Sequence, residues 1–223
     1  GEPAPRRTVR LCASSSSLRS MNCAHCGVGI QGTAALAQLV SVTASLTQLD
    51  MRGNDPTDDG LRALGRALLL SSVCPLSFLR CDAFDLGESV KQLKLKPFLD
   101  GSAALTLLAG PLKRNTVVRE LGVYDATFGI ESSSALASSM ATQSSVTALR
   151  LVRARIGDAG VVALAQGLKR RTQRNMRTLH IEDCDFGPEG AKALAASLSG
   201  LTSLMELGIC HDLVRDPAVH LIV

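Results

Sequence analysis

Residues 146–168, VTALRLVRARIGDAGVVALAQGL, decide the fold of this chain. They combine the frame Leu-x-x-Leu-x-Leu-x-x-(Asn/Cys), with Val146 in its first position, and a helical stretch rich in Ala and Leu. The frame returns mostly every 28 residues, with first positions at Leu18, Leu46, Val90, Val118, Val146, Met176 and Leu204. Self-similarity at this period predicts a solenoid, in which each unit buries its apolar face against its neighbours.

Each unit is predicted to hold a short strand, a turn and a helix. In the strand the Leu positions point inward and the residues between them outward, as period-2 alternation requires. Gly, Asp and Pro in the turns GNDPTDDG, ARIGDAG and DFGPEG start the helices. Asp58 and Asp158 fall near helix N-termini, where the helix dipole favours a negative charge.

One unit near the middle of the chain breaks the rhythm. The largest gap, from Leu46 to Val90, contains a further strand frame in PLSFLRCDAF, beginning at Leu76. Only residues 85–89 then remain before the next frame, which is too short for the usual helix. The sequence therefore predicts eight strands, about seven helices and a helix-less repeat near 76–89, which changes the spacing of the outer face and the local curvature.

Composition supports one elongated domain. The 223 residues are 46% hydrophobic but include one Tyr, five Phe and no Trp, which suits stacked layers of Leu, Ala and Val better than a globular core. We expect residues 1–17 to be a linker or disordered segment and residues 18–223 to form the repeat domain. The chain opens with Gly1 and ends within a repeat, so we expect a fragment truncated at its C-terminus.

Charge and cysteine content narrow the setting. The net charge of +4 and the pI near 8.8 fall short of the footprint of a nucleic-acid-binding protein. No apolar stretch of about 18 residues predicts a membrane span, and the first residues lack the apolar core of a signal peptide. The seven cysteines are an odd set, largely explained by the repeat frame, so we expect free thiols in a reducing, cytoplasmic compartment.

Three stretches, LTQLDMRGNDPTDDGLRALGRAL, VTALRLVRARIGDAGVVALAQGL and MRTLHIEDCDFGPEGAKALAASL, resemble the ribonuclease-inhibitor-like class of leucine-rich repeats. The resemblance covers about residues 18–223. It implies a horseshoe with parallel strands on the concave face and helices on the convex face, and a role in protein recognition, as in the sensor regions of NOD-like receptors. Five units have neither Asn nor Cys at the position where the family has one of them, which puts regular hydrogen bonding at those turns in question. The residues there are Phe84, Phe98, Ala126, Ala154 and Asp212.

Two constellations suggest a metal, but the structural interpretation is favoured for both. Cys23 and Cys26 form a CxxC, yet both fall on frame positions and no second CxxC follows at zinc-ligand spacing. The second group lies on adjacent predicted strands, where exposed polar side chains are ordinary, and comprises His180, Glu182, Cys210 and His211. We expect no metal and no cofactor.

Catalysis has little support, since the chain lacks a phosphate-binding loop, a serine nucleophile elbow and an HExxH motif. The Ran-type GTPase-activating proteins share this repeat class and use a loop arginine, a role for which Arg52 and Arg153 are the candidates. A basic run could bind nucleic acid or lipid, but it lacks interleaved aromatics and suits a helix C-terminus; it comprises Lys169, Arg170, Arg171, Arg174 and Arg177.

The outward strand positions form the predicted binding surface. Its middle strands gather aromatic and basic residues, the types enriched at binding hot spots. The candidate partner-binding residues are Asp50, Arg52, Phe78, Arg80, Lys94, Lys96, Tyr124, Arg150, His180 and Glu182. The sequence thus predicts a non-catalytic protein-interaction module that binds a protein with an acidic or mixed patch. The alternatives are a GTPase-activating protein and a structural subunit that docks through its helices.

Overall fold

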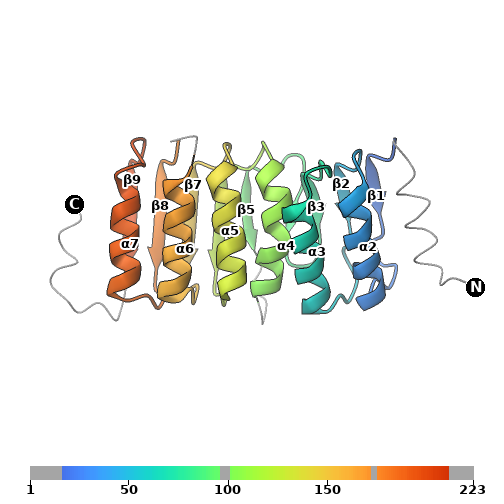
Figure 1. The fold of residues 1–223 in the computed structure, drawn as a ribbon, viewed down its shortest axis with the longest axis horizontal. Helices are drawn as coiled ribbons and strands as arrows, with labels where there is room; N and C mark the ends of the chain where they lie inside the picture. The colour runs from blue at the N-terminus through green and yellow to red at the C-terminus, as the bar shows by residue number, and fades with distance from the viewer. Residues whose placement is uncertain (1–16, 96–100, 172–174, 211–223) are drawn as a thin grey trace, which may run out of the picture.

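A computed structural model describes residues 17–95, 101–171 and 175–210 as strands alternating with helices along one axis (Figure 1). The helices are α2 (Ile30–Val42), α3 (Asp58–Leu70), α4 (Gly101–Arg114), α5 (Ile130–Thr142), α6 (Gly157–Lys169) and α7 (Pro188–Leu198). The strands are β1 (Ser20–Asn22), β2 (Gln48–Asp50), β3 (Phe78–Arg80), β4 (Asp85–Leu86), β5 (Gln92–Leu95), β6 (Glu120–Tyr124), β7 (Ala148–Val152), β8 (Thr178–Glu182) and β9 (Glu206–Cys210).

The strands form two sheets, in the orders β1-β2-β3-β4 and β5-β6-β7-β8-β9. All pairings are parallel except that of β3 with β4. The predicted α/β solenoid is confirmed, with eight parallel strands in the described residues. Those residues hold six helices where about seven were predicted, because one of the seven connections between these strands has no helix and the chain after Cys210 lies outside the described residues.

The inward strand positions build the core. Leu121, Leu149 and Leu179 stand side by side in the register of the second sheet, and each is at most 1% exposed. Burying one such side chain stabilises the fold by about 1.5–3 kcal/mol. Because the same inward position recurs in every unit, these contributions form a continuous apolar row between the strands and the helices.

A shared turn follows the regular strands. Its backbone is left-handed at the same frame position in five units, namely at His25, Gly53, Asp125, Arg153 and Asp183. The amides of four of these residues extend the ladder from unit to unit, as in the bond from Arg153 N to Glu182 O at 2.9 Å, whereas Gly53 N donates to the Asp82 carboxylate. The helix-less unit departs from this pattern, since Ala83 at the equivalent position is not left-handed.

At Asn54 and Cys184, side chains at the Asn/Cys position link neighbouring units. The Asn54 amide donates to Cys23 O at 2.9 Å and accepts from Val28 N at 2.8 Å. Where the position is Ala126 or Ala154, the backbone takes over, with Arg155 N donating to Ala126 O at 2.8 Å. The hydrogen bonding at these two turns is thus maintained without the side chain.

The segment 76–89 holds β3 and β4 and no helix, so α3 and α4 pack directly on each other. Two glycines permit this contact. A Cβ on Gly65 would lie 2.5 Å from Thr106 O, and one on Gly110 would lie 2.6 Å from Leu68 Cβ. The effect of the missing helix on curvature stays a prediction. Its effect on spacing is that α3 and α4 become direct neighbours in the helix layer.

Polar side chains tie the two sheets together across the break. Arg114, at the end of α4, donates to Leu68 O at 3.1 Å and so caps the C-terminal end of α3. Asn115 Nδ2 donates to Ser77 O at 3.0 Å, just before β3. These bonds join the chain on either side of the break, where no described ladder connects β4 to β5.

The helix α4 is sunk between its neighbours. Its residues 101–112, GSAALTLLAGPL, are all buried, as expected for a helix that is apolar or small on every side. Above it, Arg66 of α3 and Glu131 of α5 form an ion pair, with Arg66 Nη2 2.6 Å from Glu131 Oε2. The helix is therefore part of the core.

The α3–α4 contact predicts the effect of Gly65→Ala. Alanine normally stabilises a helix interior by about 1 kcal/mol relative to glycine. Here the added Cβ meets backbone atoms of α4, so we expect the free energy of unfolding to fall by about 1–3 kcal/mol, measured by urea unfolding with circular dichroism. Gly200→Ala, whose Cβ makes only an ordinary 3.5 Å contact, is the control; an equal or higher stability of Gly65→Ala would contradict the packing.

Candidate binding surface on the strand face

The side of the two sheets that faces away from the helices is here called the strand face, and it corresponds to the predicted concave face. Most of its outward side chains are partly or fully exposed while the inward ones are buried, as in the exposed–buried alternation of Gln92 to Leu95, although outward Ala148 is buried. Three groups of side chains are ordered on it, one on each sheet and one at the start of the second sheet.

A hollow of about 280 Å³ lies on the first sheet. Its floor is the outward side of β1, β2 and β3, and its wall is the turn after β4. The lining residues are Ser20, Met21, Asn22, Gln48, Leu49, Asp50, Phe78, Arg80, Gly87 and Glu88. The Gln48 amide donates to the Glu88 carboxylate, which holds the wall to the floor.

Charges at the hollow are matched in pairs. Asp50 Oδ2 lies 2.6 Å from Arg52 Nη2, and this guanidinium hydrogen bond is the main reason that the pKa of Asp50 is lowered. Arg80 Nε lies 3.2 Å from Asp85 Oδ1. The Glu88 carboxylate therefore carries the charge in the lining that no described cation neutralises.

At the start of the second sheet, the only tyrosine lies flat on a glycine. Gly122 and Tyr124 are both outward on β6, and a Cβ on Gly122 would lie 2.6 Å from Tyr124 Cε2. The Lys94 ammonium sits 6.0 Å from the centre of the tyrosine ring, within reach of a cation–π interaction. A larger residue than glycine at position 122 would lift the ring off the sheet.

A charged network covers β7, β8 and β9. His180 Nδ1 lies 2.7 Å from Glu182 Oε1 and His180 Nε2 lies 3.0 Å from Glu206 Oε1. Arg150 Nη2 is 3.7 Å from Glu206 Oε2. Gly208 gives the imidazole room, since a Cβ there would lie 2.8 Å from His180 Nδ1. The close contact of His180 with Glu206 is the main cause of the lowered pKa of Glu206, followed by the hydrogen bond from Thr178.

The candidate residues fall into these three groups rather than one patch. The structure brings together Asp50, Phe78 and Arg80; Lys94 and Tyr124; and Arg150, His180 and Glu182. Arg80 and Lys94 lie on different sheets with β4 after β3, so they do not form a single basic cluster. Lys96 lies outside the described residues.

Sequence reasoning missed the wall of the hollow. Glu88 and Gly87 belong to no strand frame, and they reach the strand face only because β4 turns back antiparallel to β3. The glycines at positions 122 and 208 could have been recognised in the sequence as places where a neighbouring side chain lies on the sheet. Each occupies an outward strand position opposite or beside a large side chain, where a missing side chain allows the neighbour to lie flat.

The two suggested metal sites are not assembled in the described residues. Burial raises the pKa of the Cys23 thiol to about 11, the opposite of what a ligand or nucleophile needs. Cys26 is exposed rather than absorbed into the core, which corrects the prediction from its frame position. The two ring nitrogens of His180 face separate carboxylates rather than one point, and His211 lies outside the described residues.

The arginines of the two alternative sites are engaged. Arg52 pairs with Asp50, and Arg153 pairs with Asp125 of the preceding unit at 2.6 Å. Arg171 of the basic run is 4% exposed and donates to Met140 O of the preceding unit and to Val146 O of its own unit, so it joins the two units instead of extending an exposed basic surface. Burial lowers its pKa to about 10.

The family profile described as Leucine Rich repeat matches residues 44–65, 142–165 and 172–195. The chain is similar to ribonuclease inhibitor of Mus musculus, with 24% identity over 219 residues, which cover 92% of this chain and 48% of that protein. It is also similar to NACHT, LRR and PYD domains-containing protein 12 of Mus musculus, at 24% identity over 84% of this chain and 19% of that protein.

Among solved structures, actin-binding site 2 of leiomodin-1 matches with a TM-score of 0.43 and 19% identity, over 52% of this chain and 70% of that one. The chain thus spans about half the length of the first of these relatives and less of the second. Within the described part of the chain, no helix is both long enough and apolar enough to cross a membrane.

The cysteine environments predict a labelling pattern. The pKa of Cys23 and of Cys184 rises from 9.0 to about 11 by burial, which leaves about 100-fold less thiolate. In native protein at pH 8 we expect iodoacetamide to label exposed Cys26 and Cys210 first, read by peptide mass spectrometry. Equal rates for all four thiols in native protein, against the unfolded control, would contradict the buried positions.

The network on β8 and β9 predicts a titration. We expect the pKa of Glu206, followed by carboxyl ¹³C NMR, to lie below its ordinary 4.5. Because the folded-state pKa is lowered, this network stabilises the fold at higher pH and loses its contribution as the pH falls through that pKa. His180→Ala should raise the pKa of Glu206 more than Thr178→Val does; the reverse order would argue against the His180 contact as the main cause.

Proposed function

Since this chain is a leucine-rich repeat protein of the ribonuclease-inhibitor-like class, we propose that it is a non-catalytic protein-interaction module. It binds a protein partner through the strand face and the loops at the ends of the strands. The observation that carries the proposal is the preorganised strand face, on which Tyr124 and His180 are held flat over glycines.

Preorganisation favours binding because ordering flexible side chains at an interface costs free energy. Tyr124 is an aromatic residue beside a cation, the combination found at binding hot spots. Among the described residues Lys94 has no carboxylate partner, so it is available to an acidic group of the partner. A partner with an acidic or mixed patch over β5 and β6 suits this arrangement and gains association rate from steering.

The relatives support the same class of function. Ribonuclease inhibitor is named for its action on another protein. Because this chain covers 48% of that relative, the target of the whole protein is not carried over. We further propose a reducing intracellular setting, in which the buried Cys23 and Cys184 persist as thiols.

Neither alternative function gains an observation in its favour. A catalytic arginine must reach into the active site of a partner GTPase, whereas Arg52 and Arg153 both pair with carboxylates of this chain. Large exposed apolar side chains on the helix side are scattered over separate helix ends, as at Ile30, Leu70 and Ile130. The strand face therefore remains the proposed interface.

Photo-crosslinking tests which face binds. Benzoylphenylalanine replaces Val152, between Tyr124 and Glu182 on the strand face, or exposed Ile130 on α5. In cell extract we expect a discrete protein adduct from position 152 that excess unlabelled chain competes away. An adduct confined to position 130 would contradict the proposal and favour docking through the helices.

Charge and ring variants then test the identified partner by calorimetry. We expect Tyr124→Ala to weaken binding by roughly tenfold, as for a hot-spot residue. Lys94→Glu should weaken binding and flatten its salt dependence, because attraction to an acidic patch is screened by salt. Lys192→Glu, an exposed lysine on α7, is the matched control; equal losses for the two lysine variants would remove the strand face as the interface.

A further inference from the structure

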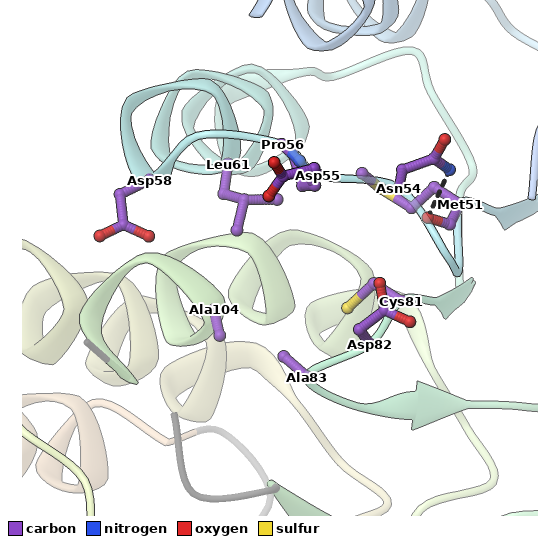
Figure 2. A pocket seen from close by; sticks show the side chains of 10 residues that line it. All are labelled: Met51, Asn54, Asp55, Pro56, Asp58, Leu61, Cys81, Asp82, Ala83 and Ala104. Carbon is purple, nitrogen blue, oxygen red and sulfur yellow. Dashed lines mark hydrogen bonds between the residues drawn. The ribbon is translucent and has the colours of Figure 1, made fainter. Parts of the chain in front are cut away.

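A partly enclosed pocket of about 100 Å³ opens beside the strand-exit loops, between the N-terminal halves of α3 and α4. Figure 2 shows Asp58 and Leu61 of α3 directed toward Ala104 of α4 across this space. The full lining is Met51, Asn54, Asp55, Pro56, Asp58, Leu61, Cys81, Asp82, Ala83 and Ala104. Its inner wall is mainly apolar, and three aspartates stand at its rim.

The pocket exists because the 76–89 unit has no helix. A regular unit would place a helix N-terminus after β3, at the level where Asp82 and Ala83 now lead directly to β4. The contact of α3 with α4 at Gly65 and Gly110 closes the gap farther along the helices. What stays open is a pocket of about 100 Å³ next to Leu61.

The unit that begins at Val146 has a regular helix after it and shows what an aspartate at the position of Asp58 does there. Asp158 lies twelve residues after its frame start, Val146, and its Oδ1 accepts hydrogen bonds from Gly187 N at 2.8 Å and Gly190 N at 2.7 Å. It thereby caps the first turn of the next helix, α7. Each side-chain bond satisfies an amide that has no partner within its own helix.

Asp58 is the equivalent residue of the second unit, twelve residues after Leu46. The unit that follows it has no helix to cap, and within the described residues the Asp58 carboxylate has no side-chain hydrogen bond or ion pair like that of Asp158. Its carboxylate, exposed at the mouth of an apolar pocket, repeats the geometry of Asp158 without the helix that Asp158 serves.

We propose that this pocket receives the first turn of a helix from the protein partner. The inference rests on the proposed protein-binding function and names a second contact for it. The amides of the incoming turn bond to Asp58, and one aliphatic side chain fills the space lined by Met51, Leu61 and Ala104. A cavity of 150 Å³ holds benzene, so this smaller pocket suits a single aliphatic side chain.

The negative charge at the rim of the pocket also favours the N-terminus of a helix as the ligand. The N-terminus of a helix carries about half a positive charge and attracts anions. Asp55, Asp58 and Asp82 supply negative charge at the rim, with Asp82 also accepting from Gly53 N at 3.0 Å. A partner helix whose first turn lacks its own carboxylate therefore fits best, since an acidic first turn would meet like charges.

A peptide that copies the internal helix α7 tests the pocket in the full chain. The probe has the sequence of residues 186–199, with Phe186→Leu to suit the pocket volume and Glu189→Gln to remove the first-turn carboxylate. Because so short a helix is marginal in water, binding is followed at millimolar peptide by methyl NMR. We expect shifts at the methyl groups of Met51 and Leu61 and none at the Tyr124 ring.

Two aspartate variants decide the role of Asp58. Asp58→Asn keeps a capping oxygen but removes the negative charge, so it should weaken peptide binding by up to about fivefold, the worth of a charge at a helix N-terminus, and Asp59→Asn should not change it. Asp59 is the matched control because its side chain is 97% exposed and pairs with Arg62. Restoring Glu189 in the peptide should also weaken binding. No methyl shifts, or equal losses for the two aspartate variants, would overturn the inference.

A variant that fills the pocket gives an independent test of the same inference. Ala104→Leu should abolish the methyl shifts at Leu61; if this variant does not fold, the Asp58→Asn comparison decides. The crosslink at Val152 separates this inference from the proposed function. A competed adduct there without peptide binding removes the pocket inference alone, and peptide binding without that adduct removes the strand-face proposal alone.

Discussion

The direct contact of α3 with α4 is the constraint on which the rest of the structure depends. The chain omits one helix, and hydrogen bonding between the described strands stops between β4 and β5. The helix layer therefore carries the continuity of the solenoid, through backbone approach at Gly65 and Gly110. Arg114 reinforces it at the C-terminal end of α3. Without this contact the two sheets would be held mainly by the loop between them.

The sequence predicted the features that repeat and missed those that occur once. The frame located all eight parallel strands because each buried Leu position recurs in every unit, as at Leu149 and Leu179. The two-residue strand β4 escaped because its pairing with β3 is a tertiary event with no periodicity. The burial of α4 was readable, since GSAALTLLAGPL contains no charged residue, whereas the ion pair of Arg66 with Glu131 above it was not.

Single side chains took roles that residue type alone did not reveal. Arg171 stood in an apparent basic run, which a helix dipole would explain, yet it reaches back to Met140 O of the preceding unit and to Val146 O at the start of its own unit. Arg114 does the same across the break. In both cases the guanidinium satisfies backbone carbonyls at a helix C-terminus, where cations are favoured. Such residues serve packing between units, so counting charges overstated the exposed basic surface.

The missing helix shapes both sides of the strands that border it. Alternation along β2 sends Asp50 to the hollow on the strand face and leaves Met51 at the pocket beside the helices, and β3 does the same with Arg80 and Cys81. The two cavities therefore share their walls through the backbone of two short strands. A change in β2 or β3 would alter both at once, whereas Asp58 and Leu61 of α3 line the pocket beside the helices only.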